Sequence, residues 1–224
     1  MKTIFGVNST PPINKKLKNG YTMYDWVKRQ KCLPAFCMRT LSGEDKITVE
    51  EIEFLKNKDC KIGLVVRDLT ELQVSTGNGT AEGLKAAEDA KRMGVPQNKG
   101  IAIFAEIKPQ WAVSHDWMFS YAMELIANGY IPGFIGNTDS SKNFNFDRQY
   151  SHYMQNTKAD NYFNTVLMAT EPKCDTVPEE WKPYCPSEME QEDVNLWCCG
   201  TTTFDFIKVE DVYAKDDKVL ENMW

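Results

Sequence analysis

Short apolar runs alternate with amphipathic stretches along most of this chain. The clearest unit begins with residues 80–93, where apolar side chains recur at helical spacing, and Gly94 marks the end of that helix. The continuous apolar run over 101–105 then predicts a parallel strand that is buried on both faces. Its polarity changes at Glu106, and in parallel α/β folds ligands bind at the carboxyl ends of strands. Glu106 is therefore the first candidate for a functional residue.

The same alternation recurs from one end of the chain to the other. Apolar runs predict eight strands, over 3–7, 33–38, 61–66, 101–105, 131–136, 164–169, 194–198 and 204–209. Amphipathic stretches predict helices over 22–28, from 48 onward, and over 80–93, 111–128 and 147–155. Residues 171–190 interrupt the alternation with four prolines and no periodicity, so we expect a long loop there over one end of the structure.

Eight strands that alternate with helices in 224 residues predict an α/β fold, a (β/α)8 TIM-like barrel. We expect one domain over residues 1–224, irregular in its last third. A doubly wound open sheet is the alternative fold. The chain contains neither of the glycine-rich motifs GxGxxG and GxxxxGK[ST], which removes the usual nucleotide-binding reason to prefer that sheet.

Composition limits the classes of partner. The formal net charge of −6 and the pI near 5.1 argue against a general nucleic-acid binder. No apolar run approaches the ~20 residues of a membrane-spanning helix. The first residues do not show the positively charged region and following apolar region of a signal peptide. We therefore expect a cytoplasmic protein or one released by a non-classical route. The pattern leaves the oligomeric state open.

The seven cysteines have no zinc-ligand spacing, and only two histidines accompany them. We therefore expect no metal and no cofactor, with cysteines that are mostly reduced and packed in the core. One disulfide, Cys174–Cys185 across the proline-rich loop, is the pairing to check.

Several motifs occur in a familiar order: FGVNS at the amino end, FCMRTL at the second strand, GNGTAEGLKAAEDAKRMGVPQNKGIAIFAEI around the fourth, then VNLWCC and FIKVEDVY. Together they resemble the glycoside-hydrolase-like barrels of the domain-of-unknown-function 1906 type, and more distantly the Chalaropsis-type (glycoside hydrolase family 25) lysozymes. The resemblance spans nearly the whole chain and is weakest over 138–190. It implies a glycan ligand such as bacterial cell-wall peptidoglycan.

Two departures from the family pattern bear on catalysis. The family's first strand usually ends G-F-D-x-S, whereas this chain has the amide Asn8 at the position of the acid. The family's fourth strand usually carries two acids spaced by one residue, and here Lys108 replaces the second of them after Glu106. A two-acid site thus looks degenerate.

Glycoside hydrolysis needs a protonated carboxyl group and an ionised one. Glu106 is the candidate acid, and the candidate partners are Glu210, which falls where the resemblance places a last-strand acid, and Asp139, at the end of the fifth strand. Glu106 has two other interpretations. It forms an ion pair with Lys108 that fills the barrel mouth, or it binds a ligand without chemistry.

Further residues at strand ends are candidates for substrate binding: Asn8, Arg39, Asp68, Lys108, Asn137, Trp197 and Tyr213. Trp197 is the favoured sugar-stacking aromatic, because the resemblance matches it to the family's seventh strand. Arg39 either braces neighbouring carboxylates or binds an anion, and bracing is favoured because a partly desolvated charge needs partners.

Two functions from different classes follow. The chain is a glycan hydrolase with Glu106 as acid and Glu210 or Asp139 as partner, or it is a glycan-binding or interaction module that keeps the barrel without hydrolysis. Fold alone does not choose between them, because barrels support many chemistries.

Overall fold

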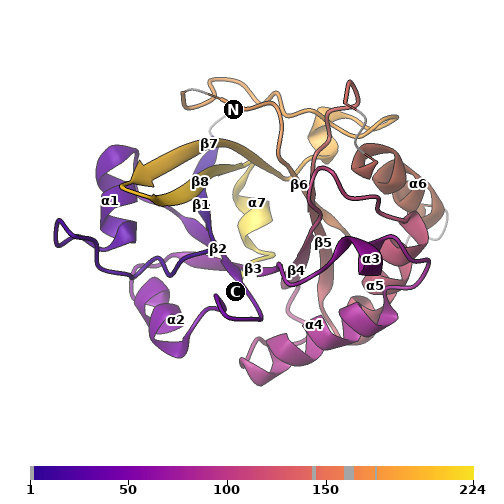
Figure 1. Ribbon diagram of the computed structural model, residues 1–224, viewed down its shortest axis with the longest axis horizontal. Helices are drawn as coiled ribbons and strands as arrows, with labels where there is room; N and C mark the ends of the chain where they lie inside the picture. The colour runs from indigo at the N-terminus through magenta and orange to yellow at the C-terminus, as the bar shows by residue number, and fades with distance from the viewer. Residues whose placement is uncertain (1–2, 143–144, 159–163, 175) are drawn as a thin grey trace.

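Eight strands form one closed barrel in the order of the sequence (Figure 1). The computed structural model describes residues 3–142, 145–158, 164–174 and 176–224. Neighbouring strands from β1 to β7 are all parallel, which confirms the predicted TIM-like barrel. The strands are β1 (Ile4–Ser9), β2 (Phe36–Thr40), β3 (Lys61–Val66), β4 (Ala102–Glu106), β5 (Ile131–Gly136), β6 (Val166–Ala169), β7 (Leu196–Phe204) and β8 (Ile207–Ala214).

Most helices cover the outside of the parallel strands, whereas the last helix packs against the interior core (Figure 1). They are α1 (Met23–Gln30), α2 (Val49–Lys56), α3 (Glu71–Val74), α4 (Thr80–Arg92), α5 (His115–Ala127), α6 (Phe146–Lys158) and α7 (Asp217–Leu220). The short helices α3 and α7 were not predicted, and α5 begins after Ser114, whose side chain caps it, rather than at Trp111. No helix in the described part of the chain combines the length and the apolar character needed to cross a membrane.

The last third departs from the repeating pattern, as predicted. Strand β8 runs antiparallel to both of its neighbours, β7 and β1, and a short turn at Asp205 and Phe206 connects it to β7. The predicted strand 194–198 therefore covers only the beginning of β7, and the predicted strand 204–209 runs across the turn between β7 and β8. Residues 171–190, apart from residue 175, which lies outside the described residues, contain no helix or strand.

Large side chains fill the inside of the barrel, and glycines on adjacent strands make room for them. A Cβ atom on Gly6 would lie 2.5 Å from the Phe36 ring, and one on Gly133 would lie 2.6 Å from the Phe104 ring. Such separations are shorter than any van der Waals contact. The interior is thus a packed core rather than a channel.

The C-terminal tail closes the amino end of the barrel. Trp224 exchanges two backbone hydrogen bonds with Ile62 at the start of β3, and the carbonyl of Asn222 accepts one from Ala102 at the start of β4. Val219 and Met223 pack against the interior core. The tail therefore covers this end of the barrel, and the parallel strands finish at the opposite end.

Candidate functional site

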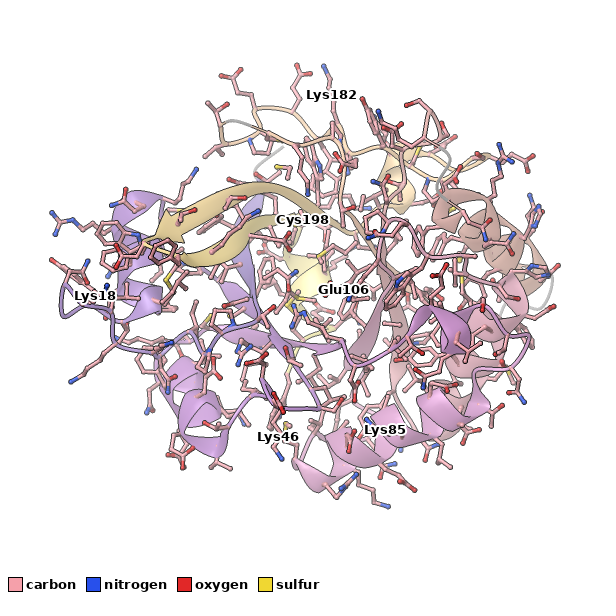
Figure 2. All side chains as sticks on the ribbon, in the orientation of Figure 1. Lys18, Lys46, Lys85, Glu106, Lys182 and Cys198 are labelled. Atoms are coloured by element: carbon pink, nitrogen blue, oxygen red, sulfur yellow. The ribbon has the colours of Figure 1, made fainter. Side chains whose placement is uncertain are left out.

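A small polar cavity lies at the carboxyl end of the parallel strands. Its volume is about 240 Å³, and we call it the mouth cavity. In Figure 2, Glu106 is labelled near the centre of the molecule, inside the ring of strands. Its lining residues come from β1, β3, β4 and β8 and the loops that adjoin them: Asn8, Thr10, Arg67, Glu106, Lys208 and Glu210.

The two carboxylates of the mouth cavity are joined by a chain of hydrogen bonds. Arg67 Nε donates to Glu106 Oε2 at 2.8 Å, and Arg67 Nη2 donates to Asn8 Oδ1. The amide of Asn8 in turn donates through Nδ2 to Glu210 Oε2 at 2.8 Å. Arg67 also donates to the hydroxyl of Thr40 at 2.6 Å. One network therefore fixes both acids relative to each other.

Strand geometry explains why these side chains meet. Along β3, Val65 packs inside the barrel, so Arg67, two positions later, points to the same side. The same alternation on β4 brings Glu106 above Phe104. Asn8 and Glu210 are direct partners across the antiparallel pair of β1 and β8, so their side chains share a face.

Cys198 lies beneath the acids and contacts Glu210. Burial and the neighbouring Glu210 carboxylate raise the pKa of the Cys198 thiol well above its usual value. The thiol therefore stays protonated near neutral pH, which removes it as a nucleophile.

The partner of Glu106 is Arg67 rather than the predicted Lys108. Lys108 lies in the loop after β4, where its side chain is exposed and its ammonium is 5.0 Å from the centre of the Trp111 ring. The strand ends at Glu106, so the alternation that would have placed both side chains on one face does not extend to Lys108. The predicted Glu106–Lys108 ion pair is therefore wrong, and Arg67 is the cation that pairs with Glu106.

Arg39 does not reach the mouth cavity. It is completely buried and forms a two-point ion pair with Glu51, at 2.7 and 3.0 Å. Its remaining donors bind the backbone carbonyls of Ser9, Thr10 and Asp45. Arg39 therefore braces the loops around the mouth, as its favoured interpretation held, and has no donor left for a ligand.

The other predicted acids lie at separate places on the surface. Asp68 binds Ser42 and Lys85 at the edge of a groove of about 760 Å³ beside α2 and α4. Burial opposes ionisation of Asp68, but these hydrogen bonds outweigh it and lower its pKa.

Asp139 lines another cavity, of about 340 Å³, with Thr138 and Tyr184. A hydrogen bond from the Ser141 hydroxyl lowers the pKa of Asp139, and Asn137 is buried and accepts a hydrogen bond from the Asp139 backbone. Neither Asp139 nor Asn137 is among the residues that line the mouth cavity, and the lowered pKa of Asp139 does not suit a general acid.

The two predicted aromatic ligands face away from the mouth cavity. Trp197 is buried, donates to the carbonyl of Pro172 at 3.0 Å and packs edge-on against Trp181. Tyr213 packs against Phe5 on the outer side of the barrel. The prediction that Trp197 faces a ligand was wrong because inward and outward positions alternate along β7, and Cys198 occupies the inward one.

A second cavity adjoins the mouth cavity and shares Lys208 and Glu210 with it. Its volume is about 430 Å³, and we call it the side cavity. It lies between the chain after β6 and the outer faces of β7 and β8, and its lining includes three lysines and two cysteines: Lys31, Lys173, Lys208, Cys174 and Cys199.

Within the described ranges, no group of three His, Cys, Asp or Glu side chains could hold a metal ion. All seven cysteines are thiols, so the Cys174–Cys185 disulfide is not present. Cys185 instead contacts the carbonyl of Met189 at 3.2 Å.

Sequence reasoning missed Arg67, Thr10 and Lys208. Arg67 adjoins Asp68, which was selected as the polar residue at the end of strand three. Arg67 lies two positions after Val65, so the two side chains point to the same side of the strand. The sequence does not show that this side is the inside of the barrel, because the strand is apolar on both faces.

Solved structures with similar folds bear on this arrangement. An uncharacterised protein of B. stearothermophilus matches with a TM-score of 0.77 at 21% identity, covering 99% of this chain and 100% of that one. The catalytic domain of the endolysin ply40, from a phage of Listeria monocytogenes, matches with a TM-score of 0.58 at 12% identity, covering 99% and 98%. The Streptococcus pneumoniae virulence factor GHIP, a glycosyl hydrolase 25, matches with a TM-score of 0.55 at 9% identity, covering 100% and 92%.

The chain has a glycoside-hydrolase-like fold. At these identities the likeness concerns the fold alone. No protein-family model matches the chain, and no curated protein does.

Proposed function

We propose that this protein binds a glycan, of the bacterial cell-wall type, in its mouth cavity. We also propose that the chain is related to the domain-of-unknown-function 1906 barrels that its motifs resemble. The single observation that carries it is the balance of charge and hydrogen-bonding groups around the cavity. Two cations, Arg67 and Lys208, face two carboxylates, Glu106 and Glu210, so the formal charge of the lining sums to zero.

A charge-balanced polar cavity suits a neutral ligand with many hydroxyl groups. Each sugar hydroxyl both donates and accepts hydrogen bonds, and the lining offers acceptors on the carboxylates and donors on Arg67, Lys208 and Asn8. The endolysin catalytic domain and the glycosyl hydrolase 25 among the structural neighbours support a saccharide of this kind.

Binding is favoured over hydrolysis by the state of the acids. Glu106 is engaged by Arg67, and Glu210 accepts a hydrogen bond from Asn8. Hydrolysis needs two carboxyl groups that are free to act on the substrate, whereas each of these already has a hydrogen-bond partner in the protein. Hydrolysis is nevertheless the second candidate, because Glu106 and Glu210 line the same cavity as a retaining or inverting pair would.

One pair of assays separates the two functions. Wild-type protein is mixed with insoluble peptidoglycan, and both the co-sedimenting fraction and the turbidity of the suspension are followed. We expect sedimentation without loss of turbidity. Glu106→Gln and Glu210→Gln should each weaken binding about tenfold, since each removes a charged hydrogen-bond partner.

Glu88→Gln is the matched control, because Glu88 is exposed on α4, and it should bind like the wild type. If the wild type lowers the turbidity and Glu106→Gln does not, the function is hydrolysis rather than binding alone. Absence of both sedimentation and turbidity loss would refute the proposal altogether.

A further inference from the structure

Two cysteines from distant parts of the sequence meet in the side cavity. Cys174 follows β6, and Cys199 lies on β7 beside the irregular pairing between Cys198 and Gly200. The backbone N–H of Cys174 donates to the carbonyl of Cys199 at 2.6 Å. Their thiols are also within hydrogen-bonding contact of each other. Disulfides join residues whose Cα atoms lie about 4.4–6.8 Å apart, and residues joined by a direct backbone hydrogen bond have comparable separations.

The two thiols differ in access. Cys199 is buried, whereas Cys174 is half-buried, and both line the side cavity. Burial, followed by the Cys174 thiol, raises the pKa of Cys199. A small reagent that enters the cavity therefore reaches Cys174 first, and the protonated Cys199 thiol lies behind it as the resolving cysteine.

The other cysteines are placed differently. Cys198 points into the barrel, on the opposite face of β7 from Cys199. Cys37 and Cys60 are buried in the core outside the barrel, and Cys185 lines the separate cavity beside Asp139. Cys32 is exposed near the end of α1. The Cys174–Cys199 pair is thus distinguished by direct contact together with access from a cavity.

We propose that Cys174 and Cys199 form a thiol–disulfide exchange site for low-molecular-weight disulfides. The Cys174 thiolate attacks a disulfide R–S–S–R, forming a mixed disulfide and releasing one thiolate R–S⁻. The Cys199 thiol then gives its proton to the released R–S⁻ while its sulfur attacks the mixed disulfide at the Cys174 sulfur, forming the Cys174–Cys199 bond and releasing the second R–S⁻. The two cysteine protons end on the two released thiols, and the two electrons reduce the oxidant.

The resulting bond would tie the chain after β6 to the wall of the side cavity. It encloses residues 174–199, a loop long enough for a crosslink to stabilise the folded chain by restricting the unfolded one. Lys208 and Glu210, which the side cavity shares with the mouth cavity, lie next to this bond. The site therefore couples redox state to the rigidity of one wall of the mouth.

Glutathione disulfide is the probe. Wild-type protein is incubated with it, digested without reduction and analysed by mass spectrometry, and thiols are counted under denaturing conditions. We expect a peptide crosslinked between Cys174 and Cys199, a fall from seven thiols to five, and a rise in Tm of about 5–10 °C that dithiothreitol reverses.

Two serine variants test which cysteines form the disulfide bond. Cys185→Ser is the matched control and should form the same crosslink, whereas Cys174→Ser should form no internal disulfide and show no rise in Tm. A crosslink from Cys174 to Cys185 or Cys198, or stable glutathione adducts without an internal bond, would overturn the proposal. The outcome is independent of glycan binding.

Discussion

At the scale of single residues, Asn8 is the centre of the mouth cavity because an amide both donates and accepts. Its Nδ2 donates to Glu210, and its Oδ1 accepts from Arg67. The acid that the family resemblance places at this position could only accept in its ionised form. The departure from the family pattern thus has a structural reason, since the amide keeps Glu210 from facing a second carboxylate.

The substitution Asn8→Asp tests this role. We expect the free energy of unfolding at pH 7 to fall by about 1–3 kcal/mol, because the new carboxylate lies against Glu210 without a donor between them. Two facing carboxylates hold a shared proton more tightly in the folded state than in the unfolded state. The loss should therefore shrink as the pH falls from 7 toward 4.

Urea denaturation at both pH values measures the effect. Asn19→Asp, at an exposed turn, serves as the control and should change little at either pH. A loss for Asn8→Asp that grows on acidification would show that the two carboxyl groups do not face each other.

At the scale of elements, the helix pair α4 and α5 packs unusually closely through a glycine. A Cβ atom on Gly83 would lie 2.8 Å from the backbone carbonyl oxygen of Tyr121. Alanine in place of glycine usually stabilises a helix by about 0.5–1 kcal/mol. Here the overlap is with backbone, which cannot move aside without separating the helices.

Gly83→Ala should therefore lower the free energy of unfolding by about 1–3 kcal/mol, as overpacked sites do. Thermal or urea denaturation checks this, with the exposed Glu88→Ala on the same helix expected to lie within about 0.5 kcal/mol of the wild type. A stabilised Gly83→Ala variant would mean that α4 and α5 are farther apart than described.

The elements also show what a sequence pattern can and cannot predict. Helices with an apolar stripe and strands with an apolar run were found at nearly their observed positions, because burial imposes those periods. The turn between β7 and β8 was missed because Asp205, at a positive φ of 50°, takes the place of the glycine that usually marks a two-residue hairpin. Because this turn was missed, the antiparallel direction of β8 was not predicted either.

At the scale of the whole molecule, the antiparallel β8 brings Glu210 to the mouth. An eighth strand parallel to the others would present its carboxyl end there, whereas β8 presents its amino-terminal half. The pairing of Glu106 with Glu210 was predicted from the resemblance, and both residues do line one cavity. The favoured bracing role of Arg39 was found, whereas the role of Trp197 was not predictable from its strand alone, since it depends on which side of the barrel wall the side chain takes.

The proposed saccharide site lies among Glu106, Glu210 and their partners. Calorimetric titration with soluble peptidoglycan oligosaccharides tests it most directly, with the double variant Glu106→Gln/Glu210→Gln compared with Asp68→Asn, which alters the separate groove beside α2 and α4. We predict saturable binding to the wild type, affinity reduced at least tenfold in the double variant, and unchanged affinity in Asp68→Asn. Undiminished binding by the double variant, or loss of binding on Asp68→Asn alone, would contradict the account.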